Sequence, residues 1–263
     1  MLRYCSLFSG SSGNCIYAGT ADGGILLDVG VSAKRIETAL RERDIDPTTI
    51  RAVFLTHEHS DHVAGLQVLC KRYGWAVLAS EGTLDALCES GKLDACRRVY
   101  MMEPGQSVTV SGLQVSSYAT PHDSRQCFGY RIDGEGRSLA VATDLGYMPD
   151  EVLDVIRGCD LIHIESNHDP DLLRNGPYPY YLQQRILGQG GHLSNGACAA
   201  VLPSLVEAGT TRIVLAHLSE QNNTPVLAQR CAAEGLAACG IAVGRDCLLT
   251  VAEPTGTQAV TYF

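Results

Sequence analysis

Short apolar runs alternate along the chain with segments in which apolar residues recur at helical spacing. Apolar runs of this length predict buried strands, and a spacing of three or four residues predicts amphipathic helices. The alternation indicates a layered α/β architecture, and no repeat or linker divides it, so we expect one domain over residues 1–263. We expect strands at residues 24–27, 52–55, 108–110, 113–115, 139–142, 161–164 and 213–216.

Capping residues mark where the helices begin and end. Ser32 is typical of a helix N-cap, and Gly74 is typical of a residue that ends a helix. Thr224 and Pro225 are a favoured pair for the cap and the first helical position. We expect helices after Ser32, at 63–74, at 80–91, at 194–208 with Pro203 inside it, and from 225 to about 240.

Polar residues that can bind metals follow several of these strands. They are Asp28, His57, Asp144, Glu165 and His217. The carboxyl ends of strands in α/β proteins converge on one edge of a sheet, where such proteins place their sites. The pattern therefore predicts an active-site rim.

The richest stretch is His-Glu-His-Ser-Asp-His at residues 57–62. Imidazole and carboxylate together suit Zn²⁺, Mn²⁺ or Fe. His57 and His59 can bind one ion together, while Asp61 and His62 can bind a second. The alternative is a surface loop that is rich in histidine by chance, but further ligands recur later in the chain at His122, Asp144 and His217.

Composition narrows the class of protein. The formal net charge of the 263 residues is −9, which argues against a basic DNA-binding module but not against a metal-dependent nuclease. The 11 cysteines contain no Cys-x-x-Cys pair, and we expect a reduced, cytoplasmic protein. No apolar run approaches the ~20 residues of a membrane span, so we expect no membrane partner.

The motif at 57–62, with Asp28 before it and further ligands after it, resembles the signature of the metallo-β-lactamase fold over essentially the whole chain. The resemblance implies an αββα sandwich of two mixed sheets flanked by helices, with a site for two divalent ions, Zn²⁺ or Mn²⁺. Asp28 would support the histidines without binding metal, although an ordinary turn residue is an equal alternative. By position, the first ion would take His57, His59 and His122, the second Asp61, His62 and His217, and Asp144 would bridge them.

Further blocks resemble the YycJ (WalJ) family of exonucleases. They are residues 6–14, 165–169, 175–181, 191–195 and 216–219. The resemblance implies a cytoplasmic, metal-dependent nuclease that acts on DNA from a 5′ end, with a 5′-phosphate on the substrate.

The chemistry expected of such a site is in-line displacement at phosphorus by a hydroxide shared between two ions. Asp61 would orient this nucleophile or accept its proton. His192 would donate a proton to the leaving 3′-oxygen, with Glu165 holding its tautomer. This arrangement resembles the Glu–His pair of tRNA 3′-processing enzymes of the same fold. His192 could instead contact a phosphate or cap a helix.

Substrate contacts are expected from two segments and one histidine. The Ser9–Asn14 loop can form an anion-binding nest or simply a tight turn. Cationic and aromatic side chains at 171–191 suit a nucleic-acid strand, although the tyrosines could pack against the domain edge. His168 could line the pocket or lie in a polar loop. The expected contacts are Ser12, Asn14, His168, Arg174, Tyr178, Tyr181, Arg185 and Asn195.

Two other functions remain open at this stage. A small-molecule hydrolase acting on a cyclic phosphodiester, a thioester or a lactone would use the same ligands, because one fold hosts many chemistries. A regulatory metal-binding protein without turnover is a further alternative. Only 22 residues separate His122 from Asp144, and 73 separate Asp144 from His217, so we expect no inserted domain. The sequence leaves the oligomeric state open.

Overall fold

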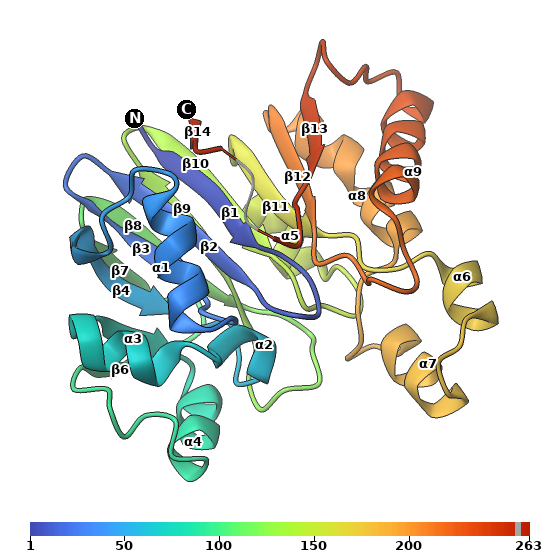
Figure 1. Cartoon of the computed structure of the whole chain (residues 1–263). Coiled ribbons are helices and arrows are strands. Elements are labelled where there is room, and N and C mark those ends of the chain that lie inside the picture. Colours follow the sequence, from blue (N-terminus) through green and yellow to red (C-terminus); the bar gives the residue numbers. More distant parts are fainter. Residues whose placement is uncertain (256–258) are drawn as a thin grey trace. The chain divides into compact units, whose positions relative to one another are not determined.

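The computed structural model describes residues 1–255 and 259–263 (Figure 1). The chain divides into two compact units. The single domain expected over residues 1–263 remains a prediction. Unit 1 holds Met1–Ala119, Ser124–Arg137 and Glu253–Phe263, and unit 2 holds Thr120–Asp123 and Ser138–Ala252.

One mixed sheet of seven strands forms the larger layer of unit 1. Its strands are β1 (Arg3–Phe8), β2 (Cys15–Thr20), β3 (Gly23–Leu27), β4 (Ile50–Phe54), β5 (Ala76–Ala79), β6 (Val99–Met101) and β14 (Thr261–Tyr262). They lie in the order β14-β1-β2-β3-β4-β5-β6. Pairing is antiparallel from β14 to β3 and parallel from β3 to β6. The apolar runs at 24–27 and 52–55 are confirmed as buried strands.

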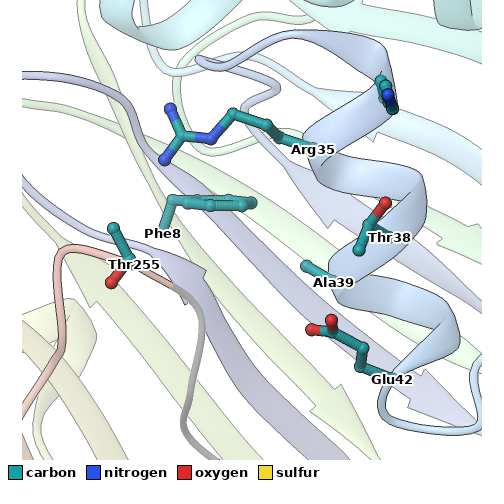
Figure 2. A pocket seen from close by; sticks show the side chains of 7 residues that line it. Phe8, Arg35, Thr38, Ala39, Glu42 and Thr255 are labelled. Atoms are coloured by element: carbon teal, nitrogen blue, oxygen red, sulfur yellow. The ribbon is translucent and has the colours of Figure 1, made fainter.

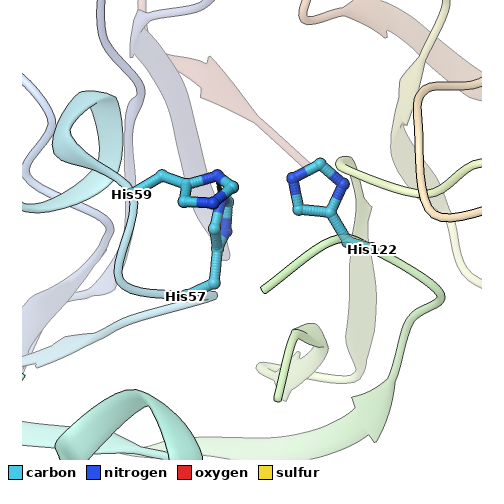
Figure 3. Close-up of side chains that lie close together, drawn as sticks. All are labelled: His57, His59 and His122. Atoms are coloured by element: carbon cyan, nitrogen blue, oxygen red, sulfur yellow. Dashed lines mark hydrogen bonds between the residues drawn. The ribbon is translucent and has the colours of Figure 1, made fainter. Parts of the chain in front are cut away.

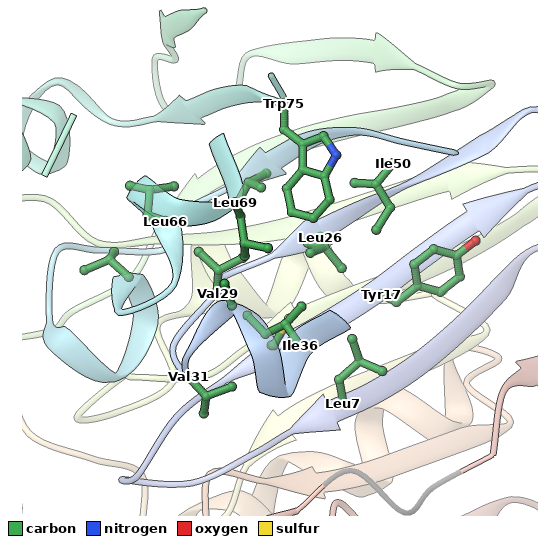
Figure 4. Packing of buried hydrophobic residues seen from close by; sticks show 14 of the residues in the cluster. Leu7, Tyr17, Leu26, Val29, Val31, Ile36, Ile50, Leu66, Leu69 and Trp75 are labelled. Atoms are coloured by element: carbon green, nitrogen blue, oxygen red, sulfur yellow. The ribbon is translucent and has the colours of Figure 1, made fainter. Parts of the chain in front are cut away.

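The helices of unit 1 bury their apolar faces against this sheet. Ile36 on α1, and Leu66 and Leu69 on α3, are fully buried in one cluster with Leu26 (Figure 4). Leu40 on α1 is fully buried in the same cluster. Gly74 ends α3 in the left-handed conformation, at φ 66°, as the sequence predicted. The helices are α1 (Ala33–Arg41), the 3₁₀ helix η1 (Pro47–Thr49), α2 (Ser60–Val63), α3 (Leu66–Tyr73) and α4 (Glu81–Glu89).

Three further antiparallel strands of unit 1 include the two strands predicted at 108–110 and 113–115, which form a hairpin around Ser111. They are β7 (Ser107–Val110), β8 (Leu113–Ala119) and β9 (Phe128–Gly134). Ser111 and Gly112 both have positive φ, at 53° and 73°, which is the conformation that a two-residue hairpin turn requires. A hydrogen bond joins β9 to the residue that follows β4: the buried hydroxyl of Tyr130, on β9, donates to the Leu55 carbonyl at 2.7 Å.

Unit 2 is built on four parallel strands, which confirms the predictions at 139–142, 161–164 and 213–216. They are β10 (Arg137–Ala142), β11 (Leu161–Glu165), β12 (Arg212–Ala216) and β13 (Leu248–Val251). β11 lies between β10 and β12, and β13 follows β12. Because β11 is central, its last residue has a strand end on each side.

The helix beginnings predicted at 194 and at 225 are confirmed, and each has a side-chain cap. Ser194 Oγ accepts from Ala197 N at 3.2 Å, and Thr224 Oγ1 accepts from Leu227 N at 3.2 Å. Most of two short helices, α6 and α7, falls in the segment 171–191 that is expected to contact substrate. The helices are α5 (Asp150–Ile156), α6 (Pro170–Asn175), α7 (Tyr180–Leu187), α8 (Asn195–Glu207) and α9 (Pro225–Ala238).

Membrane-crossing helices are absent from the described part of the chain: no helix there combines the necessary length with the necessary apolar character.

Candidate functional site

Three predicted site residues adopt a backbone conformation that side chains rarely tolerate. Asp28, Asp144 and His217 have φ of 58°, 58° and 53°. Each follows a strand, after β3, β10 and β12 respectively. Non-glycine residues in the left-handed region cluster at functional sites, where the surrounding structure holds them in place. Three of the six non-glycine residues with positive φ in the described part of the chain therefore lie at strand ends that the sequence predicted as site positions.

The histidine loop of unit 1, residues 57–62, brings three imidazoles together. His57 and His62 are fully buried, and their ring centroids lie 4.1 Å apart. His57 Nε2 lies 2.9 Å from His59 Nδ1, and Figure 3 shows the two rings on this loop. Ring nitrogens at this distance can share a proton or face one ion, so the donor set suits a divalent metal.

A buried carboxylate fixes the orientation of this loop. Asp28 accepts from Thr56 N at 2.8 Å and from Thr56 Oγ1 at 2.9 Å, and its Oδ2 lies 2.8 Å from His62 Nδ1. Burial raises the pKa of the Asp28 carboxyl, against the effect of the hydrogen bonds from His62 and Thr56. With Nδ1 donating to Asp28, the lone pair of His62 lies on Nε2, which is how carboxylates orient metal-binding histidines.

Asn14 has a structural role that the sequence did not reveal. It was predicted to contact substrate, but its side chain is buried and its backbone N donates to the Asp61 carbonyl at 2.8 Å. Asn14 Nδ2 lies 3.1 Å from His62 Nε2, and Asn14 Oδ1 accepts from Gly10 N at 3.0 Å. Asn14 therefore positions the second half of the histidine loop. Ser12, on the same turn, is exposed.

Gly30 makes this close approach possible. Gly30 N donates to the Asn14 carbonyl at 2.8 Å. A Cβ atom on Gly30 would lie 1.6 Å from the Asp61 carbonyl oxygen, which no rearrangement of a side chain could relieve. The backbone at Gly30 thus fixes how near Asp61 comes to the Ser9–Asn14 loop.

An Asp28→Ala variant is expected to lower the affinity of the histidine loop for a divalent ion by about 10- to 100-fold. The reason is that His62 Nδ1 and both Thr56 donors lose their acceptor. Titration calorimetry with Zn²⁺ measures this, with Asp22→Ala as the control because Asp22 is exposed on a turn of the same unit. Equal affinities for the two variants would contradict the role given to Asp28.

A carboxylate–imidazole cluster lies in unit 2. It consists of Asp144, Glu165, His192 and His217, one ligand atom of each lying within 4.8 Å of the others. Asp144, Glu165 and His217 are buried, whereas the His192 side chain is 21% exposed. This exposed edge makes His192 the member that a solvent-borne substrate can reach.

Glu165 organises the cluster. Its Oε1 lies 2.7 Å from His192 Nδ1 and 2.9 Å from His217 Nδ1, and its Oε2 accepts from Leu145 N and Leu193 N at 3.0 and 3.1 Å. Burial raises the pKa of Glu165, but the two imidazoles outweigh burial and hold the pKa well below its usual range. The ionised carboxylate therefore directs both Nδ1–H groups toward itself and places both lone pairs on Nε2.

The sequence predicted the contact of Glu165 with His192 but missed its contact with His217. The contact with His217 could have been inferred from the position of Glu165 at the end of β11, the strand between β10 and β12 along the chain. In a parallel sheet the central strand has a neighbour on each side, so its last residue can reach both of them.

His122 also belongs to unit 2. Its Nδ1 donates a hydrogen bond to the Gly191 carbonyl at 3.1 Å, and its ring centroid is 5.1 Å from that of His192. Its Nε2 lies 3.4 Å from Asp123 Oδ1 and 3.9 Å from Asp144 Oδ1. Burial lowers the pKa of His122, which favours the neutral form that binds metals.

His168 and Asn195, two predicted substrate contacts, lie in the interior. His168 is 1% exposed, and burial lowers its pKa to about 4. Asn195 Oδ1 accepts from Ser166 Oγ at 2.7 Å and from Asn223 Nδ2 at 2.9 Å. The side-chain amide of Asn195 is thus engaged in a buried polar network that sequence patterns did not indicate.

The remaining predicted contacts lie on α6, on α7 and on the segment between them. Tyr180 and Tyr181 are 74% and 75% exposed, so they do not pack against the domain edge. Arg185 pairs with Asp123, and Arg174 lies 3.7 Å from Asp171. Tyr178 is half-buried on the segment between the helices. Exposed aromatic rings beside arginines are typical of surfaces that stack on nucleic-acid bases.

Unit 1 also contains a cavity of about 580 Å³ that the sequence did not predict (Figure 2). Its walls come from Phe8, from α1 and from Thr255. The Arg35 guanidinium lies 4.8 Å from the centroid of the Phe8 ring. The cavity shares no lining residue with the histidine loop, so it is not part of that cluster.

Comparisons with known proteins agree with these features. The family described as "Beta-lactamase superfamily domain" matches residues 24–218. The chain is 36% identical over 247 residues to the exodeoxyribonuclease WalJ of Streptococcus pneumoniae, covering 93% of this chain and 91% of that protein. It is 33% identical over 262 residues to the exodeoxyribonuclease YycJ of Bacillus anthracis, covering 99% of each.

A solved structure shows the same fold. The metallo-beta-lactamase fold protein YhfI of Bacillus subtilis superposes with a TM-score of 0.73 at 14% identity, covering the whole of both chains. The predicted fold class, the α/β metallo-β-lactamase αββα sandwich, is confirmed, and so is the resemblance to the YycJ (WalJ) exonucleases.

Proposed function

The chain belongs to the beta-lactamase superfamily, and on that premise we propose that it is an exodeoxyribonuclease that degrades DNA from a 5′ end with two divalent metal ions. That it is a metal-dependent hydrolase follows from its family and its relatives. The observation that carries the proposed chemistry is Glu165, whose one carboxylate oxygen orients both His192 and His217. A cytoplasmic location is part of the proposal, supported by the odd number and scattered spacing of the 11 cysteines.

The residues of both units suit a metal. In unit 1 the ligands proposed are His57, His59, Asp61 and His62, and in unit 2 they are His122, Asp144 and His217. Imidazole nitrogens and carboxylate oxygens bind Zn²⁺ and Mn²⁺ alike. Hydrogen bonds to Asp28, Gly191 and Glu165 already select the tautomers of His62, His122 and His217 that place a lone pair on Nε2, the atom that would bind a metal. At His62 this lone pair faces Asn14 Nδ2, 3.1 Å away. When bound, the ions would supply Lewis-acid activation of a phosphoryl group and of water.

The protein residues would supply proton transfer and orientation. Asp61, whose side chain is 23% exposed, can orient an attacking water or take its proton. His192 receives a fixed orientation from Glu165 through Nδ1, so Nε2 is the atom that would exchange a proton with the leaving 3′-oxygen. Removal of the Glu165 charge would then weaken His192 both as a base and as an oriented donor.

The α6–α7 surface would bind the DNA strand. Tyr180 and Tyr181 can stack on bases, while Arg174 and Arg185 can contact phosphates. The exposed Ser12 is a further proposed contact for a 5′-phosphate. The buried positions of Asn14, His168 and Asn195 give them supporting roles within their own units in the proposal.

The proposal is tested by incubating the protein with a 5′-phosphorylated duplex in Mn²⁺, labelled at either end in separate reactions. We expect mononucleotides to be released from the 5′ end. Release from the 3′ end would overturn the direction. No release from any duplex, with both metal positions shown to be filled, would overturn the nuclease and direct the search to cyclic phosphodiesters and thioesters.

A His192→Ala variant is expected to slow turnover by about 10²- to 10⁴-fold while both metals remain bound. The proton donor is lost, but the proposed ligands are untouched. Single-turnover kinetics and metal analysis of the same sample measure the two effects separately. Gln189→Ala, an exposed change on the same loop, is the control. Loss of metal from His192→Ala would instead make His192 a ligand.

A further inference from the structure

Strand β6 presents apolar side chains at an edge of the seven-stranded sheet in unit 1. Val99, Tyr100 and Met101 are consecutive and are 36%, 53% and 49% exposed. Within the described residues, β6 pairs only with β5. An exposed apolar edge strand is a template for pairing with another chain, and proteins normally protect such edges with charge, proline or a bulge.

The backbone of β6 is available for such pairing on its outer side. Val77 N donates to the Arg98 carbonyl at 2.8 Å, and Met102 N donates to the Ala79 carbonyl at 2.8 Å. The backbone C=O of Arg98 and the backbone N–H of Met102 thus face β5. Because successive residues of a strand face opposite sides, Val99 and Met101 direct their N–H and C=O groups away from β5.

We propose that β6 pairs antiparallel with β6 of a second copy of this chain, with Tyr100 on the two-fold axis. This register places Val99 opposite Met101 of the partner subunit, and both of these residues have outward N–H and C=O groups. The two residues can therefore form a hydrogen-bonded pair of an antiparallel ladder, in which the N–H of each donates to the C=O of the other. The same contact is repeated by symmetry, as a two-fold interface requires.

Charge selects this register. With Tyr100 at the centre, Arg97 lies opposite Glu103 of the partner subunit, and both side chains are exposed in the single chain. Moving the centre by one residue would place Arg97 opposite Met101 or Gly105 of the partner subunit, and the opposite charges would not meet. The segment from Arg97 to Glu103 is thus complementary to itself in one antiparallel alignment.

The apolar surface continues beside the strand. A pocket of about 280 Å³ is lined by Leu78 of β5, by Tyr100 and Met101 of β6, and by Val108 and Val110 of β7. Pairing along β6 brings the partner subunit's apolar side chains to this pocket, so the interface would bury more than the strand itself. The proposal is independent of the proposed nuclease activity.

Charge exchange tests the interface in solution. Sedimentation velocity across a concentration series should show a dimer of the native chain. Arg97→Glu and Glu103→Arg should each raise the dimer Kd by about tenfold or more, because like charges then lie opposite one another. An equal mixture of the two variants should form a heterodimer, since every pair across that interface is again opposite in charge. A native chain that is monomeric throughout, or a mixture that behaves as the separate variants do, would overturn the proposal.

A cross-link tests the register directly. Residues on the axis form a pair without hydrogen bonds, whose Cα atoms lie about 4.5 Å apart, and this separation admits a disulfide. Tyr100→Cys should therefore give a covalent dimer on mild oxidation. Tyr262→Cys is the matched control, since Tyr262 is 55% exposed on β14 at the other edge of the same sheet. Equal cross-linking of the two variants would reject the assigned register.

Discussion

Asp61→Ala is expected to reduce the rate of nucleotide release by on the order of a thousandfold. The change removes the only carboxylate of the histidine loop that is proposed to orient the attacking water, and it removes a proposed ligand as well. Asp61 Oδ2 lies 3.3 Å from His62 Nε2, so the carboxylate and the imidazole are close enough to contact the same ion. The measurement is nucleotide release from the 5′-phosphorylated duplex in Mn²⁺ at saturating substrate.

The control for this prediction is Asp85→Ala. Asp85 is exposed on α4 of the same unit and lies outside the histidine loop. We expect its rate to equal that of the native protein. If Asp61→Ala retained most of the native rate with a full complement of metal, Asp61 would have no part in the reaction.

Glu165→Ala is expected to lower the free energy of unfolding by about 3–5 kcal/mol. The side chain is fully buried, and its two oxygens serve two imidazoles and two backbone N–H groups. Truncation would leave buried donors without an acceptor, and each such donor costs about 1–3 kcal/mol. Urea unfolding of the metal-free protein, followed by circular dichroism, measures the loss.

Two further variants define what this loss means. Glu165→Gln keeps the shape and one acceptor, so its unfolding free energy should fall between those of the native and alanine proteins. Glu207→Ala removes an exposed glutamate at the end of α8 and should change the unfolding free energy by about 0.5 kcal/mol at most. A Glu165→Ala protein as stable as Glu207→Ala would mean that the network contributes nothing to the fold.

Much of the fold could be predicted from the sequence, because its local signals agree with its buried structure. The apolar runs became strands, and the caps at Ser194 and Thr224 begin α8 and α9 as predicted. The strand-end residues were found for the same reason. A polar residue at the end of a buried strand lies at the edge of the sheet, so the pattern of apolar runs identified Glu165 and His217 as site candidates.

The supporting contacts could not be predicted, because they join residues far apart in the chain. Asn14 contacts Asp61 across 47 positions, and Asn195 contacts Asn223 across 28. Asparagine and glycine are common in loops, so neither Asn14 nor Gly30 carries a local sign that it lies against the histidine loop. Short motifs indicate which residue types are present, whereas burial decides whether they meet substrate or hold another residue.

The left-handed backbone at Asp28, Asp144 and His217 has a consequence for anyone who engineers this chain. Each such residue costs about 1–2 kcal/mol relative to an unstrained position, and glycine would relieve most of that cost. Glycine at Asp28 would still lower the stability, because Thr56 and His62 would lose their buried acceptor and each such donor costs about 1–3 kcal/mol. The same reasoning applies to His217, whose Nδ1 lies 2.9 Å from the buried Glu165 carboxylate. The buried hydrogen bonds thus hold the strained backbone in place, so a selection for heat resistance alone would keep these side chains.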